Sequence, residues 1–320
     1  MNKPDILHVP VMIKEAMDSL NLFSGGTWID CTVGDGGHSK QILQNTAPDG
    51  FLIGFDRDGN ALDIAEQRLK DYRGRFKLIQ DSYANINRQV SELSTGKIDG
   101  ILFDLGFSSR QIEGLGYGFS FMNAEKLDMR FDQSKGVSAL DIVNEYAVDE
   151  LTRVIKDYGE ERAAKRIAQG IIDARPLYTT KDLADVVKKC VYSKGLSRHP
   201  ATKTFQALRI EVNDELGNLE DGLQKSVFLM RPRARISLIT YHSLEDKIVK
   251  SFFKNRAEFC HCPKELPICV CEDNTDLKIV NKKVIKPSKE EIMMNRRSRS
   301  AKMRIAEKKN PNHEGGYSER

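Results

Sequence analysis

Short apolar runs and amphipathic stretches take turns along the first third of the chain. Apolar runs rich in β-forming residues cover 28–33, 51–55, 75–81 and 98–105, and a fifth follows much later at 235–241. The run at 98–105 is almost continuously apolar, as a parallel strand buried on both faces should be. An amphipathic helix is expected at 60–72, between two of the runs. The pattern predicts a doubly wound α/β domain.

The middle of the chain has a helical pattern instead. Helices are expected near 139–146, 149–174, 181–192 and 202–216, with another around 219–229 before the fifth strand. No strand pattern interrupts them. The sequence therefore predicts an α/β domain in two parts, residues 1–112 and 216–320, around an inserted helical domain of residues 113–215 that we expect to bind substrate.

The connection between the first two strands is rich in glycine. Gly34, Gly36 and Gly37 allow a sharp turn and a close approach to a ligand, and Ser39 is a candidate cap for the following helix. Asp56 ends the second strand, where a carboxylate can accept both hydrogen bonds of a ribose diol. This arrangement is typical of a site for a cofactor that carries a nucleoside.

The charges beside the glycines distinguish between two kinds of cofactor. A dinucleotide site has the pattern G-x-G-x-x-G and leaves the helix N-terminus free for a pyrophosphate. Here Asp30 and Asp35 flank the glycines, and two carboxylates would repel a pyrophosphate. They favour a cofactor with a cationic end, such as S-adenosylmethionine. For the glycine cluster alone, a tight turn that binds nothing remains the alternative.

The loop after the fourth strand carries the candidate chemistry. Asp104 and Phe107 stand in the order Asp-Leu-Gly-Phe, which has the polar and aromatic ends of the polar-Pro-Pro-aromatic motif of amino-group methyltransferases but lacks its prolines. In such a motif the polar side chain accepts the amine hydrogens and the aromatic ring stacks on an extruded base. The alternative for Asp104 is a carboxylate that only caps the next turn.

Composition and length narrow the class of protein. With 320 residues, 40% hydrophobic and 30% charged, the chain has the composition of a soluble globular protein of more than one domain. It contains no apolar run of about 18 residues and no signal-peptide core near its N-terminus. Six cysteines do not make a disulfide scaffold in a chain of this length. We expect a cytosolic protein.

The net charge of +4 is unevenly distributed. Residues 278–309 contain twelve Lys or Arg and three Glu, a local charge of +9, so the remaining residues carry −5. A solvated tail and a phosphate-binding segment both fit such a run. Interleaved apolar residues, among them Ile279, Ile285 and Met303, favour two strands of an ordered sheet. We expect the arginines at 296, 297 and 299 to contact RNA phosphates.

Four cysteines form a C-x-C pair followed by a second C-x-C pair. Their sulfurs could enclose a structural zinc ion, although the prolines between the pairs could equally shape a plain loop. These residues are Cys260, Cys262, Cys269 and Cys271. Cys31 and Cys190 have the pattern of ordinary buried thiols.

Eight ordered motifs together resemble the bacterial ribosomal RNA small subunit methyltransferase H family, also called MraW. They are HVPVM (8–12), DCTVGDGGHS (30–39), GFDRD (54–58), DGILFDLGFSSRQ (99–111), LDMRFD (127–132), HPATKTFQALRIEVNDEL (199–216), ISLITYHSLEDKIVK (236–250) and RRSRSAKMR (296–304). The resemblance implies a class I S-adenosylmethionine-dependent methyltransferase with a Rossmann-like sheet and an inserted all-helical domain. It also implies methyl transfer to N4 of a cytidine in the decoding region of 16S rRNA.

The matched motifs imply a set of cofactor contacts. These are Gly36, Gly37 and His38 at the turn, Asp56 on the ribose, Tyr83 near the adenine, Asp104, and Gln111 in the loop after the fourth strand. Asp35 and Asp81 could join them or could only form turns.

Other polar residues are weaker candidates. His242 follows the fifth strand, and we expect a structural or RNA-positioning role for it rather than base catalysis, since an exocyclic amine can lose its proton after methyl transfer. Four further residues could line an RNA cleft or could be plain surface charge, with Lys203 and Arg209 on one helix face: Arg130, Lys203, Arg209 and Asn213.

The sequence therefore predicts an rRNA (cytidine-N4) methyltransferase. A DNA or small-molecule amino-methyltransferase would explain the helical insertion and the basic segment poorly, and a non-catalytic RNA-binding protein would not need the glycine turn with Asp56. The expected partner is 16S rRNA or the assembling small ribosomal subunit. We expect no association with a membrane. The sequence leaves the oligomeric state open, a homodimer included.

Overall fold

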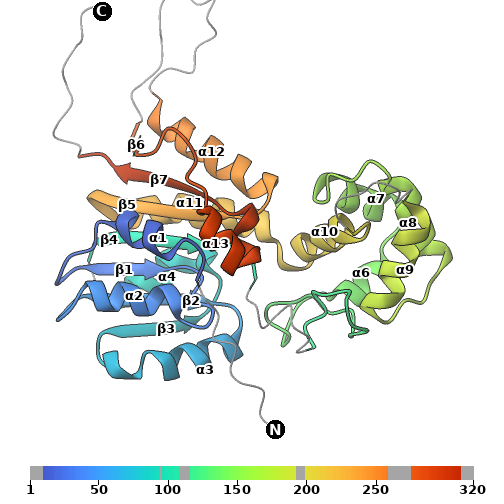
Figure 1. The fold of residues 1–320 in the computed structure, drawn as a ribbon, viewed down its shortest axis with the longest axis horizontal. Coiled ribbons are helices and arrows are strands. Elements are labelled where there is room, and N and C mark those ends of the chain that lie inside the picture. The colour runs from blue at the N-terminus through green and yellow to red at the C-terminus, as the bar shows by residue number, and fades with distance from the viewer. Residues whose placement is uncertain (1–9, 94–95, 108–115, 192–198, 259–274, 311–320) are drawn as a thin grey trace, which may run out of the picture. The chain divides into compact units, whose positions relative to one another are not determined.

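A seven-stranded sheet organises the two end portions of the chain. The computed structural model describes residues 10–93, 96–107, 116–191, 199–258 and 275–310. The strands lie in the order β3-β2-β1-β4-β5-β7-β6 (Figure 1). They are β1 Thr27–Asp30, β2 Phe51–Asp56, β3 Phe76–Gln80, β4 Ile98–Asp104, β5 Met230–Thr240, β6 Leu277–Ile279 and β7 Lys302–Lys308. The first five are parallel, and β7 runs antiparallel to both β5 and β6. All five expected strands are present.

Helices cover both faces of the sheet (Figure 1). One face packs against α1 Ile13–Leu20, α2 Gly37–Asn45 and α3 Gly59–Arg68, and the other against α4 Ile86–Glu92, α11 Glu215–Leu229 and α12 Ser243–Ala257. Successive strand residues point to opposite faces, so Trp28 and Ile29 enter different cores, and both are fully buried. Burial on both faces explains why these strands are apolar throughout.

The middle of the chain forms a second compact unit, residues 107–217, while the residues before and after it make up the first. Its helices are α6 Ala139–Glu145, α7 Val148–Asp157, α8 Ala164–Asp173, α9 Thr180–Cys190 and α10 Thr202–Asn213. They bury a core of their own, which includes Leu151, Ile167 and Leu183. Ser138 and Thr179 cap α6 and α9 through their hydroxyls. Within the described part of this unit no β-strand is present.

The single helix expected over 149–174 is wrong, because the chain breaks it into α7 and α8. Glu160 has a left-handed φ of 48°. A Cβ at Gly159 would lie 2.6 Å from the carbonyl oxygen of Ile155 and 2.8 Å from that of Lys203. Gly159 therefore permits a close approach between α7 and the start of α10, which a continuous helix would not allow.

The basic segment is an ordered part of the first unit. It contributes β6 and β7, as expected, and also α13 Lys289–Met294 and a 3₁₀ helix, Arg296–Ser300. Ile285 pairs with Met303 in an isolated bridge beside β7. The apolar residues between the charges are therefore used for pairing and packing.

The strand order reverses between β1 and β4, which are neighbours in the sheet although β2 and β3 lie between them in sequence. Ligands of open α/β sheets bind at such a point, outside the carboxyl ends of the strands. Asp30 ends β1 and Asp104 ends β4.

Among the described residues, no helix is both long and apolar enough to cross a membrane.

Candidate functional site

The glycine turn between β1 and α2 is tightly packed on one side and open on the other. Gly34 and Gly36 have left-handed φ values of 50° and 80°. A Cβ at Gly36 would lie 3.1 Å from that of Ala65 on α3, and a Cβ at Gly37 would lie 2.3 Å from Cγ of Pro10. Around Gly34, in contrast, no described atom lies within 4 Å of the Cβ position. The turn therefore packs against the protein through Gly36 and Gly37 and leaves room for a ligand beside Gly34.

Ser39 does not cap α2, so this expectation is wrong. The helix begins at Gly37, after Gly36, and no described side chain caps it. The Ser39 hydroxyl instead donates to Oδ2 of Asp30, at 2.7 Å, while the backbone N–H of Thr32 donates to Oδ1, at 3.1 Å. Burial raises the pKa of Asp30, although His38 and these hydrogen bonds oppose the shift. Asp30 thus belongs to the interior of the turn.

His38 lies inside the turn with both ring nitrogens facing polar groups. Its Nε2 is 3.0 Å from the carbonyl oxygen of Val11 and its Nδ1 is 3.5 Å from Oδ2 of Asp104. Since a carbonyl only accepts, Nε2 carries the hydrogen and Nδ1 of the neutral ring presents a lone pair. Burial lowers the pKa of His38, so the neutral ring is favoured. His38 therefore connects the turn to Asp104.

Asp56 closes the other side of the turn from the end of β2. Its Oδ2 accepts a hydrogen bond from the backbone N–H of Gly34, at 2.8 Å, and its Oδ1 from that of Asp58, at 2.9 Å. Burial raises the pKa of Asp56 to about 6. Each oxygen keeps a second lone pair, so the ionised carboxylate can also accept two ribose hydroxyls.

Asp104 is held at the end of β4 by three neighbours. Its backbone N–H donates to Oγ1 of Thr32, at 2.7 Å, and its Oδ1 accepts a hydrogen bond from the Tyr241 hydroxyl, at 2.7 Å. Its Oδ2 faces His38. Burial raises the pKa of Asp104 to about 7, and the Tyr241 hydrogen bond opposes that shift. A carboxyl with such a pKa exists in both protonation states near neutral pH.

The remaining expected cofactor residues are Tyr83 and Gln111, with Asp35 and Asp81 as weaker candidates. Tyr83 is half-buried, with its ring edge-to-face to Phe103 at 5.2 Å. Asp35 is buried, and Gln111 lies outside the described residues. Asp81 forms a local turn: burial alone would raise its pKa, but hydrogen bonds from Asn85 and other neighbours lower it.

Phe107 belongs to the second unit, where it is part of a group of aromatic rings. It stacks on Phe119 with centroids 5.9 Å apart and planes at 5°, and the Arg209 guanidinium lies 4.6 Å from its centroid. Glu215 holds that guanidinium with two hydrogen bonds, of 2.7 and 2.8 Å. The Phe107 side chain remains 39% exposed. Its orientation is therefore fixed while part of the ring stays accessible.

The other polar candidates of the second unit hold the unit together. Arg130 makes two hydrogen bonds to Asp128, and Asn213 donates to the carbonyl of Met129. Lys203 is exposed and donates to the carbonyl of Glu160, whereas Arg209 is buried. The expectation that Lys203 and Arg209 share one helix face is thus wrong: six residues turn a helix by about 240°.

His242 has a structural role, as expected. It caps α12: its Nδ1 accepts a hydrogen bond from the backbone N–H of Glu245, at 3.4 Å. The Glu245 carboxylate in turn accepts two hydrogen bonds, from the backbone N–H groups of Tyr241 and His242. This capping box directs the chain immediately after Tyr241.

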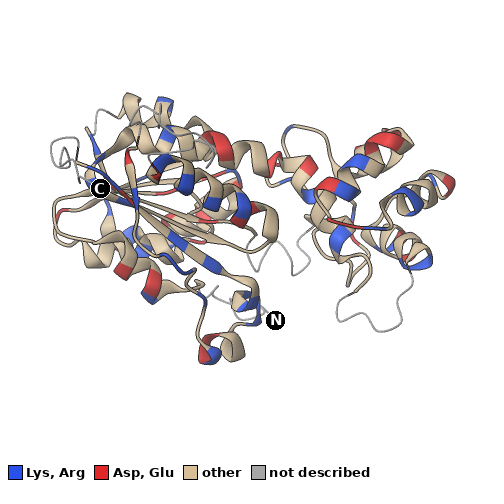
Figure 2. Ribbon diagram, turned by 90° about the horizontal axis from the view of Figure 1, so that it is seen from above, with Lys and Arg blue, Asp and Glu red and all other residues tan. Residues whose placement is uncertain are grey.

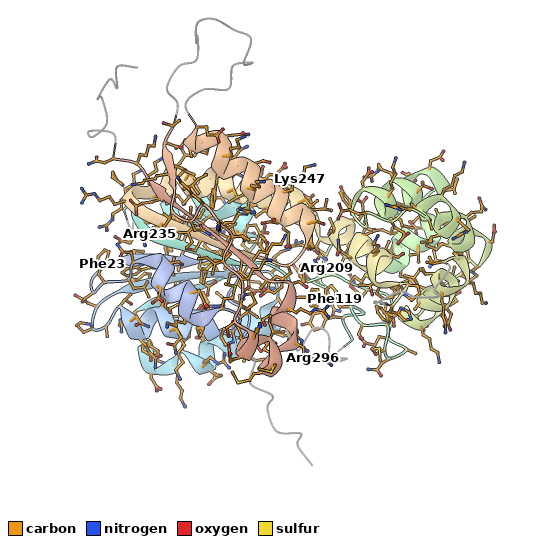
Figure 3. The ribbon with its side chains drawn as sticks, turned by 45° about the horizontal axis from the view of Figure 1, so that its top comes forward. Phe23, Phe119, Arg209, Arg235, Lys247 and Arg296 are labelled. Atoms are coloured by element: carbon orange, nitrogen blue, oxygen red, sulfur yellow. The ribbon has the colours of Figure 1, made fainter. Side chains whose placement is uncertain are left out.

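The basic segment offers both paired and exposed cations. Lys302 and Arg304 pair with Asp246 of α12. Arg296 and Arg299 are exposed, and Figure 3 marks Arg296 on the short helical stretch before β7. Acidic and basic residues are interspersed on the helices of the second unit (Figure 2). The basic excess of the chain is therefore concentrated in residues 278–309.

Two of the six cysteines lie in the part of the chain that the structure describes. Cys31 is buried and free, as expected, and burial raises its pKa well above the ordinary value. Cys190 is also a free thiol but is only half-buried, so the expectation of a buried thiol is wrong there. The two C-x-C pairs lie outside the described residues.

Sequence reasoning missed three residues that hold the site: Thr32, Tyr241 and Glu291. Tyr241 had the clearest signal, because it directly follows a predicted parallel strand, where ligand-facing residues gather. No signal in the sequence indicates Glu291, because its contact with Met12 joins opposite ends of the chain.

The strand order, with a carboxylate at the end of β2 and another at the end of β4 beside a glycine turn, defines a class I S-adenosylmethionine-dependent methyltransferase fold. Comparison with known proteins agrees. The model of the MraW methylase family matches residues 5–309, and the chain belongs to that family.

Two curated relatives are similar over nearly their full length. The ribosomal RNA small subunit methyltransferase H of Clostridioides difficile (strain 630) is 47% identical over 306 residues, which cover 94% of this chain and 98% of the relative. The protein of the same name from Finegoldia magna is 46% identical over 307 residues, with the same coverage. An rRNA methylase structure from Streptococcus thermophilus superposes with a TM-score of 0.43 at 11% identity, over 93% of this chain and 96% of that one. At that score the likeness adds nothing to the fold assignment.

Proposed function

We propose that this protein transfers the methyl group of S-adenosylmethionine to the exocyclic N4 amine of a cytidine in the decoding region of small-subunit ribosomal RNA. The observation that carries the proposal is the buried Asp104 carboxyl at the end of β4, held beside the glycine turn by His38 and Tyr241. Family membership supports the rRNA substrate.

The residues around the turn fit the cofactor. Gly34 leaves space, and Asp56 keeps lone pairs for the ribose hydroxyls. The Asp56 carboxylate contacts the turn at Gly34, and an acidic group there suits a sulfonium. The Arg68 guanidinium lies at the other side of the turn, beside Gly37. The other residues that the matched motifs imply for the cofactor are His38 at the turn, Tyr83 near the adenine, and Gln111. Gly36 and Gly37 would contribute through their backbones only, because their Cβ positions face Ala65 and Pro10.

Asp104 and the backbone of Leu105 would orient the amine. A cytosine amine is a poor nucleophile because its lone pair is shared with the ring. When the Asp104 carboxylate accepts an amine hydrogen, the lone pair can leave conjugation and point at the methyl carbon that the bound cofactor supplies. The bound cofactor would supply the methyl group with cleavage of its methyl–sulfur bond, and the methylated nitrogen would release its proton to solvent.

Phe107 would receive the base. A cytidine that leaves its neighbours loses stacking, which an aromatic side chain replaces at about 1–3 kcal/mol per base. The ring is partly accessible, and Arg209 and Phe119 fix its orientation.

The substrate is 16S rRNA or the assembling small subunit. Its phosphates would contact three arginines of the basic segment, Arg296, Arg297 and Arg299. The protein works in the cytoplasm, as a monomer or a homodimer.

The proposal of a structural zinc ion on the C-x-C pairs rests on the spacing of the cysteines alone. Elemental analysis of protein purified without added metal should find about one zinc per chain. Finding none would leave the pairs as a plain loop.

The proposed function is tested by methyl transfer from labelled cofactor. Unmodified small subunits, free 16S rRNA and DNA are offered separately, and the products are digested to nucleosides and identified by mass spectrometry. N4-methylcytidine from an RNA substrate is expected. A methyl group on C5, on a ribose oxygen or only on DNA contradicts the proposal, as does binding of RNA without transfer.

A further inference from the structure

The hydroxyl of Tyr241 makes the shortest polar contact to the Asp104 side chain among the described residues. Tyr241 directly follows β5, the neighbour of β4 in the sheet, and the backbone N–H of Leu105 donates to the carbonyl of Ile239, at 2.9 Å. The ends of β4 and β5 are thus tied together. The Tyr241 backbone is fixed by Glu245, and its side chain packs in the core between the sheet and α1. The hydroxyl is therefore directed at Oδ1 by rigid elements.

The two oxygens of Asp104 meet different partners. Oδ1 receives the Tyr241 hydrogen, whereas Oδ2 faces the Nδ1 lone pair of neutral His38 at 3.5 Å. Two lone pairs that face each other repel unless a proton lies between them. A donor on Oδ1 stabilises the ionised carboxylate and makes that proton easier to release. Oδ2 then becomes free to accept a hydrogen from an amine.

We propose that Tyr241 is a positioning residue for methyl transfer: its hydroxyl fixes Asp104 through Oδ1 and favours the ionised carboxylate, so that Oδ2 accepts the amine hydrogen of the substrate. This inference rests on the proposed function. No proton moves from Tyr241 during the reaction, because it donates a hydrogen bond in both states of Asp104.

The other charged groups around Asp104 make such a donor necessary. Burial and the neighbouring carboxyl groups all raise the pKa of Asp104. The neutral His38 ring has no N–H on the side that faces Asp104, so it does not oppose this rise. The titratable groups around Asp104 are His38 of α2, Asp30 of β1, Tyr241 after β5, Glu245 of α12 and Glu291 of α13. Tyr241 is thus the neighbour whose hydrogen bond favours the carboxylate. Burial, Asp104 and the nearby glutamates raise the pKa of Tyr241 itself well above its ordinary value, so it stays a donor.

The test is the pH profile of the single-turnover rate in Tyr241→Phe, with saturating cofactor and small subunits. Loss of a hydrogen bond to the carboxylate should move the acid limb of the profile upward by about one pH unit. Turnover should therefore fall about tenfold at pH values below the limb and recover at high pH. Affinities for cofactor and RNA should stay within about twofold of the unmodified protein.

Tyr146→Phe is a matched control. Tyr146 also donates to a carboxylate, that of Glu211, at 3.3 Å, but lies in the second unit, directly after α6. Removal of the Tyr146 hydroxyl should leave the pH profile of the single-turnover rate unchanged. If Tyr241→Phe does not fold, 3-fluorotyrosine at position 241, a stronger donor, should move the limb downward instead.

A uniform loss of rate at every pH, or no change, overturns the proposal and leaves Tyr241 with a packing role. Failure of the proposed function has a different signature, since the unmodified protein would then form no N4-methylcytidine at any pH.

Discussion

Glu291 accepts a hydrogen bond from the backbone N–H of Met12 at 2.7 Å, across 279 positions of the sequence. Met12 has a left-handed φ of 53° at the start of α1, and the carbonyl of the preceding Val11 faces His38. Glu291 lies on α13, just before the 3₁₀ helix that carries Arg296, Arg297 and Arg299. The basic segment and the glycine turn are therefore joined by a short chain of polar contacts.

We expect the basic segment to bind RNA phosphates. Replacing Arg296, Arg297 and Arg299 by Gln should weaken RNA binding and reduce the slope of log affinity against log salt by about two to three, because each lost phosphate contact removes nearly one unit. Fluorescence anisotropy with a labelled rRNA fragment at several salt concentrations measures the slope.

The matched control removes three exposed cations at the opposite edge of the sheet, Lys70, Arg73 and Lys77, which lie in or before β3. Their replacement by Gln should change the slope little. If both triple variants reduce it equally, RNA is attracted by net charge and the segment is not a specific contact.

Asp56 should control cofactor affinity. Asp56→Ala removes the acceptor for the ribose hydroxyls and should weaken S-adenosylmethionine binding by about 1–3 kcal/mol, measured by calorimetry. Asp58→Ala, which removes the cap of α3, should cost about 1 kcal/mol of unfolding free energy without a comparable loss of affinity. Because burial raises the pKa of Asp56 to about 6, affinity should rise as pH increases through that value. Unchanged affinity in Asp56→Ala, or tighter binding of NAD, contradicts the assignment.

Asp104 should lower stability at neutral pH. Its folded pKa of about 7 exceeds the ordinary 3.8, so the folded protein keeps a proton that the unfolded chain has released between those pH values. The free energy of unfolding should therefore decrease as pH rises from about 4 to 7, by on the order of 4 kcal/mol at most. Asp104→Asn should lack this decrease and be more stable than the unmodified protein at pH 8. If the free energy of unfolding depends on pH in the same way in both proteins, the Asp104 carboxyl is ionised in the folded as well as the unfolded state, which contradicts the prediction.

Phe107 should act in base placement. Phe107→Ala should lower the single-turnover rate on small subunits while cofactor affinity stays constant, since the ring stacks within the second unit and belongs to no cofactor contact. Phe23→Ala serves as the control, because Phe23 is similarly exposed, at 46% against 39%, in the connection before β1. A normal rate in Phe107→Ala would exclude the ring from the reaction.

The sequence predicted the α/β pattern well because strands buried on both faces must be apolar throughout, as at 98–104. It also placed Asp56 and Asp104 at the ends of two parallel strands, where ligand-facing residues gather, and their contact with a ligand stays a prediction. The break at Gly159 was missed, since what requires it is the carbonyl of Lys203, a residue 44 positions later that no local pattern reveals. Ser39 was misassigned for a similar reason: its hydroxyl prefers the buried Asp30 to the end of its own helix. Contacts across long sequence separations, such as that of Tyr241 with Asp104, depend on tertiary structure.

The insertion between β4 and β5 has a consequence for synthesis on the ribosome. While the helices from α6 to α10 emerge, β4 has been made but its partner β5 has not, so one long edge of the sheet stays open. The inserted unit buries a core of local helices and can fold during that interval. β7, Glu291 and the arginines arrive last. A nascent chain therefore contains the glycine turn early but acquires the Tyr241 contact only after the inserted unit, and the basic segment last.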